Sequence, residues 1–186
     1  MYDYIKGIIS TIAANYIVID NSGIGYSVYT PNPYSFKEND EYKVYIYQHI
    51  REDEISLYGF KSEEEKELFL KLISVKGLGP KMALPILATG SISGIIDAIE
   101  RENILYLKKF PKIGDKVAKQ MILDLKGKLG MIDSNLAEIN NSIDELVEVL
   151  KGLGYKEKEF KGILSKVDTN LSIEDQVKES LKLLLK

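Results

Sequence analysis

Two short glycine-containing stretches of the sequence have the composition of anion-binding turns. They are GLGPKMA at 77–83 and KIGDKVA at 112–118. In each, a glycine precedes a new helical pattern and a lysine follows two positions later. The unpaired N–H groups of a helix start and an ammonium group are then expected at the same edge. Glycine also removes the side chain that would keep another molecule away from the backbone. The chemistry expected of such turns is phosphate binding by main-chain donors.

The two stretches are copies of one unit. Aligning Gly79 with Gly114 superposes further pairs at the same spacing, which indicates an internal repeat of helix, tight turn and helix. These pairs are Lys81 with Lys116, Ala83 with Ala118, Leu72 with Leu107 and Leu70 with Leu105. The pattern resembles the helix-hairpin-helix motif, two of which form a four-helix unit that grips duplex DNA across the minor groove. Main-chain donors touch phosphate oxygens and no base, so binding should be independent of sequence and sensitive to salt.

The second copy departs from the motif at two positions. Lys112 replaces the first glycine, and Asp115 stands where a neutral or basic residue would help. Because a side chain at the first position narrows the approach of a phosphate, we expect contact from the later residues of that turn rather than from Lys112. The complete set of expected DNA-binding residues is Gly77, Leu78, Gly79, Lys81, Ile113, Gly114, Lys116 and Lys119.

The charge of the chain is unevenly distributed. The 186 residues carry a net charge of −3, which by itself argues against a nucleic-acid partner. Residues 61–130, however, hold 13 Lys and Arg against 9 Asp and Glu, and the segments on either side are acidic. Residues 105–130 alone contain seven lysines and two acids. A cationic surface is therefore expected around the second glycine turn, although a solvated lysine-rich helix face would have the same composition.

The composition disfavours several other classes of protein. Without cysteine the chain has no disulfide and no thiolate metal site, and the single histidine, His49, is expected to be an ordinary surface residue. No Walker A sequence occurs, since no Ser or Thr follows Lys81, and no HExxH pattern suggests zinc. No apolar run approaches the roughly 20 residues of a membrane span, and no secretory signal is present. We expect a soluble cytoplasmic protein that needs no cofactor or metal.

The elements that position the glycine turns come from two segments. Residues 1–61 contain five runs rich in Ile, Val and Tyr, separated by turn formers, which predicts a five-stranded OB-type β-barrel domain. Residues 62–132 change to a helical period, with Ser62 and Glu65 as a capping box, and are expected to form the tandem helix-hairpin-helix domain.

The remaining residues predict a separate, smaller domain. Residues 133–141 are polar and without periodicity, which predicts a flexible linker. A second capping box at Ser142 and Glu145 predicts the start of a small three-helix, UBA-like domain over 142–186. Because such a small bundle buries little apolar surface, its apolar face is available to contact a partner.

The order of these segments resembles the RuvA family. The motifs that carry the resemblance are REDEISLYGF at 51–60, GLGPKMAL at 77–84 and LGYKEKE at 153–159, and it extends along the whole chain. The resemblance implies a non-catalytic, DNA-binding subunit of a Holliday-junction branch-migration complex. It also implies tetramers, or pairs of tetramers, that bind a four-way junction and recruit the hexameric ATPase RuvB. A RuvC-type resolvase is a further partner that it suggests.

The resemblance also implies roles for residues outside the glycine turns. Glu52 and Asp53 match an acidic pin between the fourth and fifth strands, whose carboxylates repel phosphates at the crossover and guide strand separation; Glu54 is a third acid at the same tip. From the residues alone, this stretch indicates an exposed hairpin turn. Four apolar positions match those that hold the ATPase and are equally suited to an internal core. They are Leu150, Leu153, Tyr155 and Leu181.

Two other functions remain open at this point. Some helix-hairpin-helix proteins are DNA glycosylases or lyases that use a downstream aspartate, for which Asp124 is the candidate, although a helix cap or solvated side chain is the simpler interpretation. The chain could also be a non-enzymatic scaffold that binds duplex DNA without preferring junctions. Release of a base would favour the first function, and equal affinity for a junction and a linear duplex would favour the second.

Overall fold

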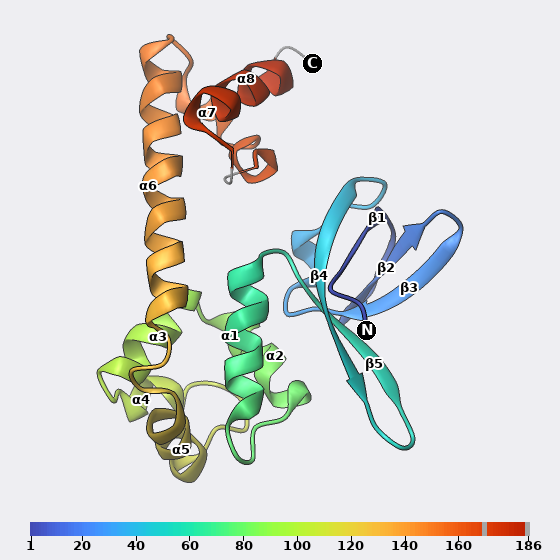
Figure 1. The fold of residues 1–186 in the computed structure, drawn as a ribbon, viewed down its shortest axis with the longest axis vertical. Coiled ribbons are helices and arrows are strands. Elements are labelled where there is room, and N and C mark those ends of the chain that lie inside the picture. The colour runs from blue at the N-terminus through green and yellow to red at the C-terminus, as the bar shows by residue number, and fades with distance from the viewer. Residues whose placement is uncertain (169–170, 185–186) are drawn as a thin grey trace. The chain divides into compact units, whose positions relative to one another are not determined.

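The computed structural model describes residues 1–168 and 171–184, with the side chains of 131, 133–141 and 165 left undescribed. The chain divides into two compact units, Met1–Ile132 and Asp133–Lys186. Figure 1 shows the barrel and the helical hairpins of the first unit and the helices of the second.

Five strands at the N-terminal end close into a barrel, as the alternating Ile, Val and Tyr runs predict (Figure 1). The strands are β1 (Tyr4–Ile12), β2 (Tyr16–Asn21), β3 (Ile24–Tyr29), β4 (Glu41–Ile50) and β5 (Ile55–Phe60), and a 3-10 turn lies at Pro33–Ser35. Their order around the barrel is β1-β2-β3-β5-β4; β3 and β5 pair in parallel and the other neighbours antiparallel. Inward-facing Ile and Val side chains fill the interior. The expected five-stranded barrel is confirmed.

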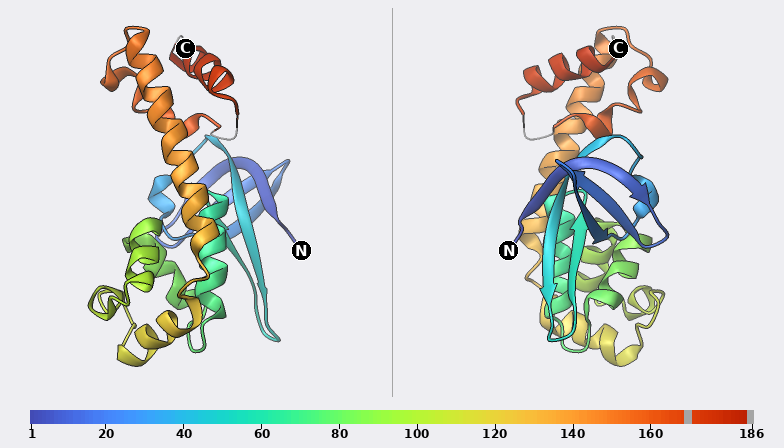
Figure 2. Two further views of the ribbon diagram at one scale, coloured as in Figure 1. Left: turned by 60° about the vertical axis from the view of Figure 1, so that its left-hand side comes forward. Right: turned by 90° about the vertical axis from the view of Figure 1, so that its right-hand side faces the viewer.

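Strands β4 and β5 continue beyond the barrel as a projecting hairpin (Figures 1 and 2). Their antiparallel pairing extends from Tyr45 opposite Phe60 to Ile50 opposite Ile55. The Arg51 N–H donates to the Glu54 carbonyl oxygen at 2.8 Å and closes the end of the hairpin. The acidic residues of the REDE sequence therefore lie at its tip.

The rest of the first unit is helical. Its helices are α1 (Glu63–Ser74), α2 (Pro80–Thr89), α3 (Ile92–Glu100), α4 (Ile104–Leu107) and α5 (Asp115–Leu125). Helices α1 and α2 form one hairpin, α4 and α5 form the other, and α3 connects the two. The ring of Phe69 on α1 lies 4.7 Å from that of Phe60 and 5.6 Å from that of Tyr58, centroid to centroid. This aromatic contact fixes the first hairpin against the barrel.

No single helix in the described part of the chain is long and apolar enough to cross a bilayer. Helices α2 and α3 reach that length and apolarity only as a pair, and the pair is bent by 106°.

Helix α6 (Gly130–Gly152) replaces the predicted linker and the predicted helix start at Ser142. Residues 133–141 lie within this helix. The physical reason is that no glycine or proline occurs between Gly130 and Gly152, and Leu, Ala, Glu and Ile among the polar residues favour helix. Ser142 is therefore inside the helix, and its hydroxyl accepts a hydrogen bond from Gln176 Nε2 at 2.9 Å instead of capping a new one.

The second unit is completed by α7 (Glu157–Phe160), a 3-10 turn at Leu164–Lys166, and α8 (Ile173–Leu184). The first of the two further helices expected here is thus reduced to short turns, and the second is present. The unit has a small core of its own around Leu146, Leu150, Phe160 and Val167.

Candidate nucleic-acid interface

The two glycine turns have the same backbone conformation. Gly79 has φ −96° and ψ 175°, and Gly114 has φ −94° and ψ 176°. The hydrogen bonds match as well, because Leu78 N–H donates to Val75 and Ile113 N–H donates to Phe110, at 3.0 and 3.2 Å. The repeat in the sequence is therefore also a repeat in the structure.

The glycines at these two positions are not required by the fold of the chain itself. Extended backbone with φ near −95° is open to any residue. A Cβ added at Gly79 or Gly114 would meet no other atom within 4 Å, whereas one added at Gly59 in the barrel would lie 2.4 Å from Val28 Cγ1. The open space at both turns leaves the backbone accessible to another molecule from outside.

Helices α2 and α5 begin with uncapped amide groups. Gly79 and Gly114 are their N-caps, and neither supplies a side-chain hydrogen bond. No hydrogen bond from the N–H of Lys81 or Lys116 is found within the part of the chain that the structure describes. The other three helices of the first unit are capped by side chains, those of Ser62, Ser91 and Asn103. Uncapped N–H groups and the helix dipole make the two turns suited to anions.

The side chains expected at this site fall into two groups. Leu78 and Ile113 are buried, with 2% and 5% of their surface exposed, so they fix the turns to the helical core and offer only backbone to a ligand. Lys81, Lys116 and Lys119 are exposed. The lysines are therefore placed to add positive charge near the uncapped amides.

Lys112 occupies a backbone position that suits glycine. Its φ is 66°, and the equivalent residue of the first turn, Gly77, has φ 89°. A side chain in this left-handed region costs on the order of 1 kcal/mol. The second turn thus keeps the shape of the first at the expense of local strain.

Replacing Lys112 with glycine is expected to raise the free energy of unfolding by about 1 kcal/mol, because the strain at positive φ is relieved. Lys112→Ala is the matched control, since it removes the same charge but keeps a Cβ at that φ. Urea denaturation of both variants measures the difference. A glycine variant no more stable than the alanine variant would contradict the assignment of strain.

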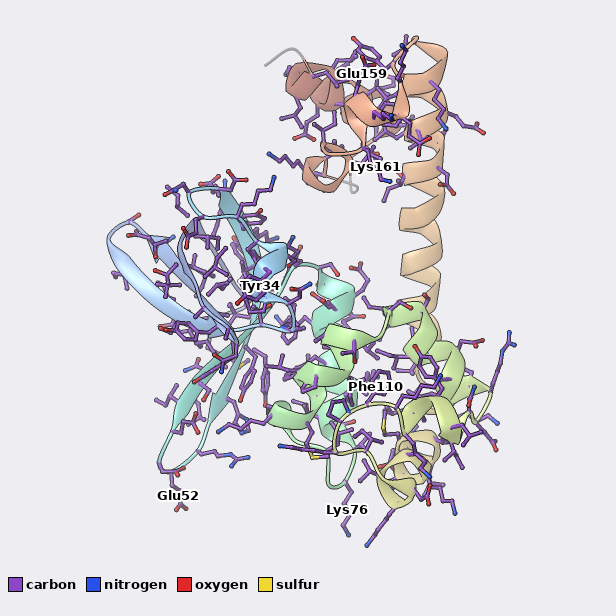
Figure 3. All side chains as sticks on the ribbon, turned by 180° about the vertical axis from the view of Figure 1, so that it is seen from behind. Tyr34, Glu52, Lys76, Phe110, Glu159 and Lys161 are labelled. Carbon is purple, nitrogen blue, oxygen red and sulfur yellow. The ribbon has the colours of Figure 1, made fainter. Side chains whose placement is uncertain are left out.

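The acidic tip of the β4–β5 hairpin and the first glycine turn lie at the same end of the first unit. Figure 3 shows Glu52 at the tip and Lys76 at the turn, both pointing outward at that end. Glu52 and Asp53 are exposed, and neither has an ion pair within the described residues. Negative charge is therefore present close to a turn suited to binding anions.

Glu54 differs from the other two acids of the tip. One carboxylate oxygen accepts the Ser56 hydroxyl at 2.6 Å, and the other lies 3.7 Å from Lys81 Nζ. The hydrogen bond from Ser56 lowers the pKa of Glu54 below its ordinary value, and the charge of Lys81 lowers it further. Glu54 is thus an ionised side chain directed toward the first turn.

Asp115, the acid of the second turn, is also paired. Its carboxylate lies 2.7 Å from Lys108 Nζ, and this contact lowers the pKa of Asp115. As the first residue of α5 it also lies near the positive end of the helix dipole. Its negative charge is therefore balanced locally.

His49, expected to be an ordinary surface residue, is part of a polar cluster near the tip of the hairpin. Its Nε2 accepts from Arg51 Nε at 2.9 Å, so this nitrogen carries no proton and Nδ1 donates to the Tyr47 hydroxyl at 3.3 Å. Its ring also lies 6.3 Å from that of Tyr58. The sequence signal was the i, i+2 spacing of Tyr47, His49 and Arg51, which places alternate residues of a strand on one face.

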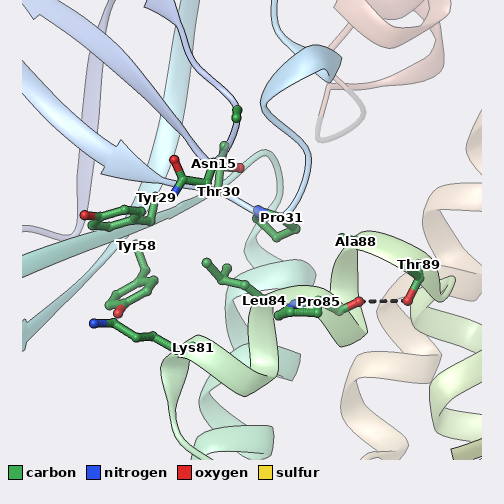
Figure 4. A pocket seen from close by; sticks show the side chains of 11 residues that line it. Asn15, Tyr29, Thr30, Pro31, Tyr58, Lys81, Leu84, Pro85, Ala88 and Thr89 are labelled. Carbon is green, nitrogen blue, oxygen red and sulfur yellow. Dashed lines mark hydrogen bonds between the residues drawn. The ribbon is translucent and has the colours of Figure 1, made fainter. Parts of the chain in front are cut away.

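Two hollows lie between helix α2 and the barrel with its β4–β5 hairpin. The smaller, of about 210 Å³, is lined by the hairpin residues His49, Arg51 and Glu54 on one side and by the start of α2 on the other. The larger, of about 490 Å³, is mainly apolar (Figure 4). Lys81 and Tyr58 line both, and Figure 4 shows the Lys81 side chain beside the Tyr58 ring. Lys81 is therefore shared between the first turn and the hairpin.

The four apolar candidates of the second unit are buried to different degrees. Leu150 is fully buried in the core, whereas Leu153 keeps 55% of its surface exposed. Tyr155 and Leu181 are partly buried and pack against the same core. Of the four side chains, that of Leu153 is the most available to a partner.

The glycosylase candidate Asp124 is engaged within its own helix. Its Oδ1 accepts a hydrogen bond from Gln120 Nε2, one turn earlier, at 2.9 Å. Among the residues that the structure describes, no group of three or more His, Asp or Glu side chains is arranged to hold a metal ion.

A five-stranded barrel joined to two helical hairpins with matching uncapped turns defines a tandem helix-hairpin-helix protein. Comparisons with known families give the same order of parts. The RuvA N terminal domain matches residues 1–59, the SAM-like helix-hairpin-helix tandem matches 69–128, and the RuvA C-terminal domain matches 141–185.

Several curated proteins are similar to this chain over its whole length. Proteins from Bacillus velezensis and Leuconostoc mesenteroides are each 46% identical to this chain, and one from Listeria innocua is 44% identical, with 100% of both chains covered in every case. All three are named Holliday junction branch migration complex subunit RuvA. The chain belongs to the RuvA family.

Proposed function

We propose that this chain is the DNA-binding subunit of a branch-migration complex, and that it binds four-way junctions without reading base sequence. The observation that carries the proposal is the pair of glycines, Gly79 and Gly114, which the fold does not need and which leave two equivalent turns open. Each turn supplies uncapped main-chain donors and a nearby lysine. Phosphate oxygens are the groups that such donors bind in DNA.

The contact residues of the proposed interface are those of the two turns. The backbone at Gly77, Leu78 and Gly79 and the ammonium of Lys81 would hold one phosphate group. The second set is Ile113, Gly114 and Lys116, which are equivalent to Leu78, Gly79 and Lys81, together with Lys119. Because both turns have the same conformation, they can hold two phosphates in the same manner.

The acidic tip has a different role in this proposal. Glu52 and Asp53 would form the pin at the crossover, where their charges repel the phosphates of strands that turn away from one another. Their exposure and the absence of ion-pair partners for them in the described residues support this role, since an unscreened carboxylate repels phosphate most strongly.

The proposal gives each part of the chain a task. The barrel of 1–61 carries the pin, the hairpins of 62–132 hold the DNA, and the helices of 142–186 recruit a RuvB-type ATPase. The chain would act as a tetramer, or as two tetramers around one junction, without catalytic residues of its own. A RuvC-type resolvase is a further partner consistent with this role, and work on chromosomal junctions would place the protein in the cytoplasm.

The test is a competition between a synthetic four-way junction and a linear duplex of the same length. We expect the junction to be bound at least about tenfold more tightly, because a planar assembly can engage all four arms at once. The mass of the complex on the junction measures the number of subunits. Equal affinities would contradict the junction-binding proposal and favour a general duplex-binding scaffold.

A further inference from the structure

Lys81, a proposed phosphate contact, already has an anionic partner within the chain. Its Nζ lies 3.7 Å from a carboxylate oxygen of Glu54 on the β4–β5 hairpin. The other oxygen of Glu54 is held by Ser56, and Ser56 is 5% exposed. The carboxylate is therefore anchored on the hairpin side and directed toward the DNA-binding turn.

The hairpin holds Glu54 in this position through further contacts. The carbonyl of Glu54 accepts the Arg51 N–H at 2.8 Å, and the Arg51 side chain donates to His49. The His49 ring lies against those of Tyr47 and Tyr58, at centroid distances of 5.9 and 6.3 Å. The fold thus presents Glu54 across a narrow hollow from Lys81.

The second turn lacks this arrangement. Lys116 has no ion pair within the described residues, and the acid of that turn, Asp115, is paired with Lys108 instead. The two turns have the same backbone conformation but differ in charge. Glu54 partly neutralises Lys81 of the first turn. Lys116 of the second turn has no such partner among the described residues.

We propose that Glu54 competes with DNA phosphate for Lys81, holding the ammonium group in the free protein and releasing it when DNA binds. The inference rests on the proposed function, because it assumes that Lys81 contacts a phosphate. No covalent step is involved, only an exchange of one anion for another at the same ammonium. Glu54 is then a positioning residue for Lys81 and not a member of the pin.

This exchange has a consequence for the dependence of binding on salt. A lysine that meets a phosphate releases a counterion from DNA and contributes up to about 0.9 to the slope of log K against log salt. When Lys81 leaves Glu54, the freed carboxylate attracts a cation from solution and offsets part of that release. Lys81 should therefore contribute less to the slope than Lys116 does.

The experiment measures junction affinity of the full-length protein from about 50 to 200 mM salt. Glu54→Gln is expected to tighten binding about two- to fivefold at the low end of this range and to steepen the slope. Lys81→Gln should weaken binding about twofold in the wild-type background but about five- to tenfold in the Glu54→Gln background. Lys116→Gln should cost about the same in both backgrounds.

Glu52→Gln is the matched control, since it removes one acid of the same tip that has no contact with Lys81. Any gain from Glu52→Gln should be the same whether position 81 is lysine or glutamine. Equal losses from Lys81→Gln in the wild-type and Glu54→Gln backgrounds would overturn the inference and leave the proposed function intact. If neither lysine substitution weakens binding in either background, the phosphate contacts of the proposed function are themselves wrong.

Discussion

Substituting glutamate for both Gly79 and Gly114 is expected to weaken junction binding by at least about 100-fold while leaving the fold unchanged. Each substitution places a carboxylate where a phosphate would bind and covers the uncapped amides behind it. Charge-assisted hydrogen bonds to a phosphate are worth about 1.5–3 kcal/mol each, so losing both turns removes most of the binding free energy that they supply. Equilibrium titration of a labelled four-way junction measures the loss.

The alanine pair, Gly79→Ala with Gly114→Ala, is the control for folding. At φ near −95° and with no atom within 4 Å of the added Cβ, alanine adds no strain. The free energy of unfolding is expected to change by less than about 1 kcal/mol at each site, because the loss of freedom in the unfolded chain is offset by the preference of N-cap positions for glycine over alanine. Undiminished junction affinity in a folded glutamate pair would remove the phosphate-binding turns from the proposal.

Replacing Leu153 with aspartate is expected to abolish recruitment of a RuvB-type ATPase and to leave junction affinity within about twofold of wild type. Leu153 is 55% exposed in the turn that follows α6, so a charge there disturbs a partner contact more than the core. Two measurements check this prediction. The first is the rate at which RuvB hydrolyses ATP when the variant and a four-way junction are added, and the second is direct binding of the two proteins.

Leu150→Ala separates this contact from folding of the second unit. Leu150 is fully buried, so its truncation should destabilise that unit by about 2–5 kcal/mol. Loss of recruitment with unchanged stability is expected only for Leu153→Asp. If the Leu153 variant stimulates the ATPase as wild type does, the partner contact lies elsewhere on the unit.

Much of the fold could be predicted because local patterns and the final structure agree. Alternating β-branched and aromatic residues mark the five strands, and the helical periods mark the hairpins. The repeat of Gly79 at Gly114 also located two turns that proved to share backbone angles. In these regions each residue favours the same conformation that the tertiary packing requires.

Other features depend on contacts that no local pattern contains. Ser142 has the sequence of a helix cap but lies inside α6, because the preceding residues contain nothing that stops a helix. The pairing of Glu54 with Lys81 joins a strand hairpin to a helix start, so it depends on how the tip of the β4–β5 hairpin lies across from the start of α2. Likewise, the difference between buried Leu150 and exposed Leu153 follows from how α7 and α8 fold back on α6.

The matched turns have a consequence for motion along DNA. In the proposed contact, every nucleotide offers the same phosphate to the same main-chain donors, so advancing the duplex by one step restores the interaction that was just broken. The binding free energy is then nearly the same at each successive position along the duplex and favours neither direction of movement. Such a contact would permit movement without favouring a direction, so the direction would have to come from a separate motor protein.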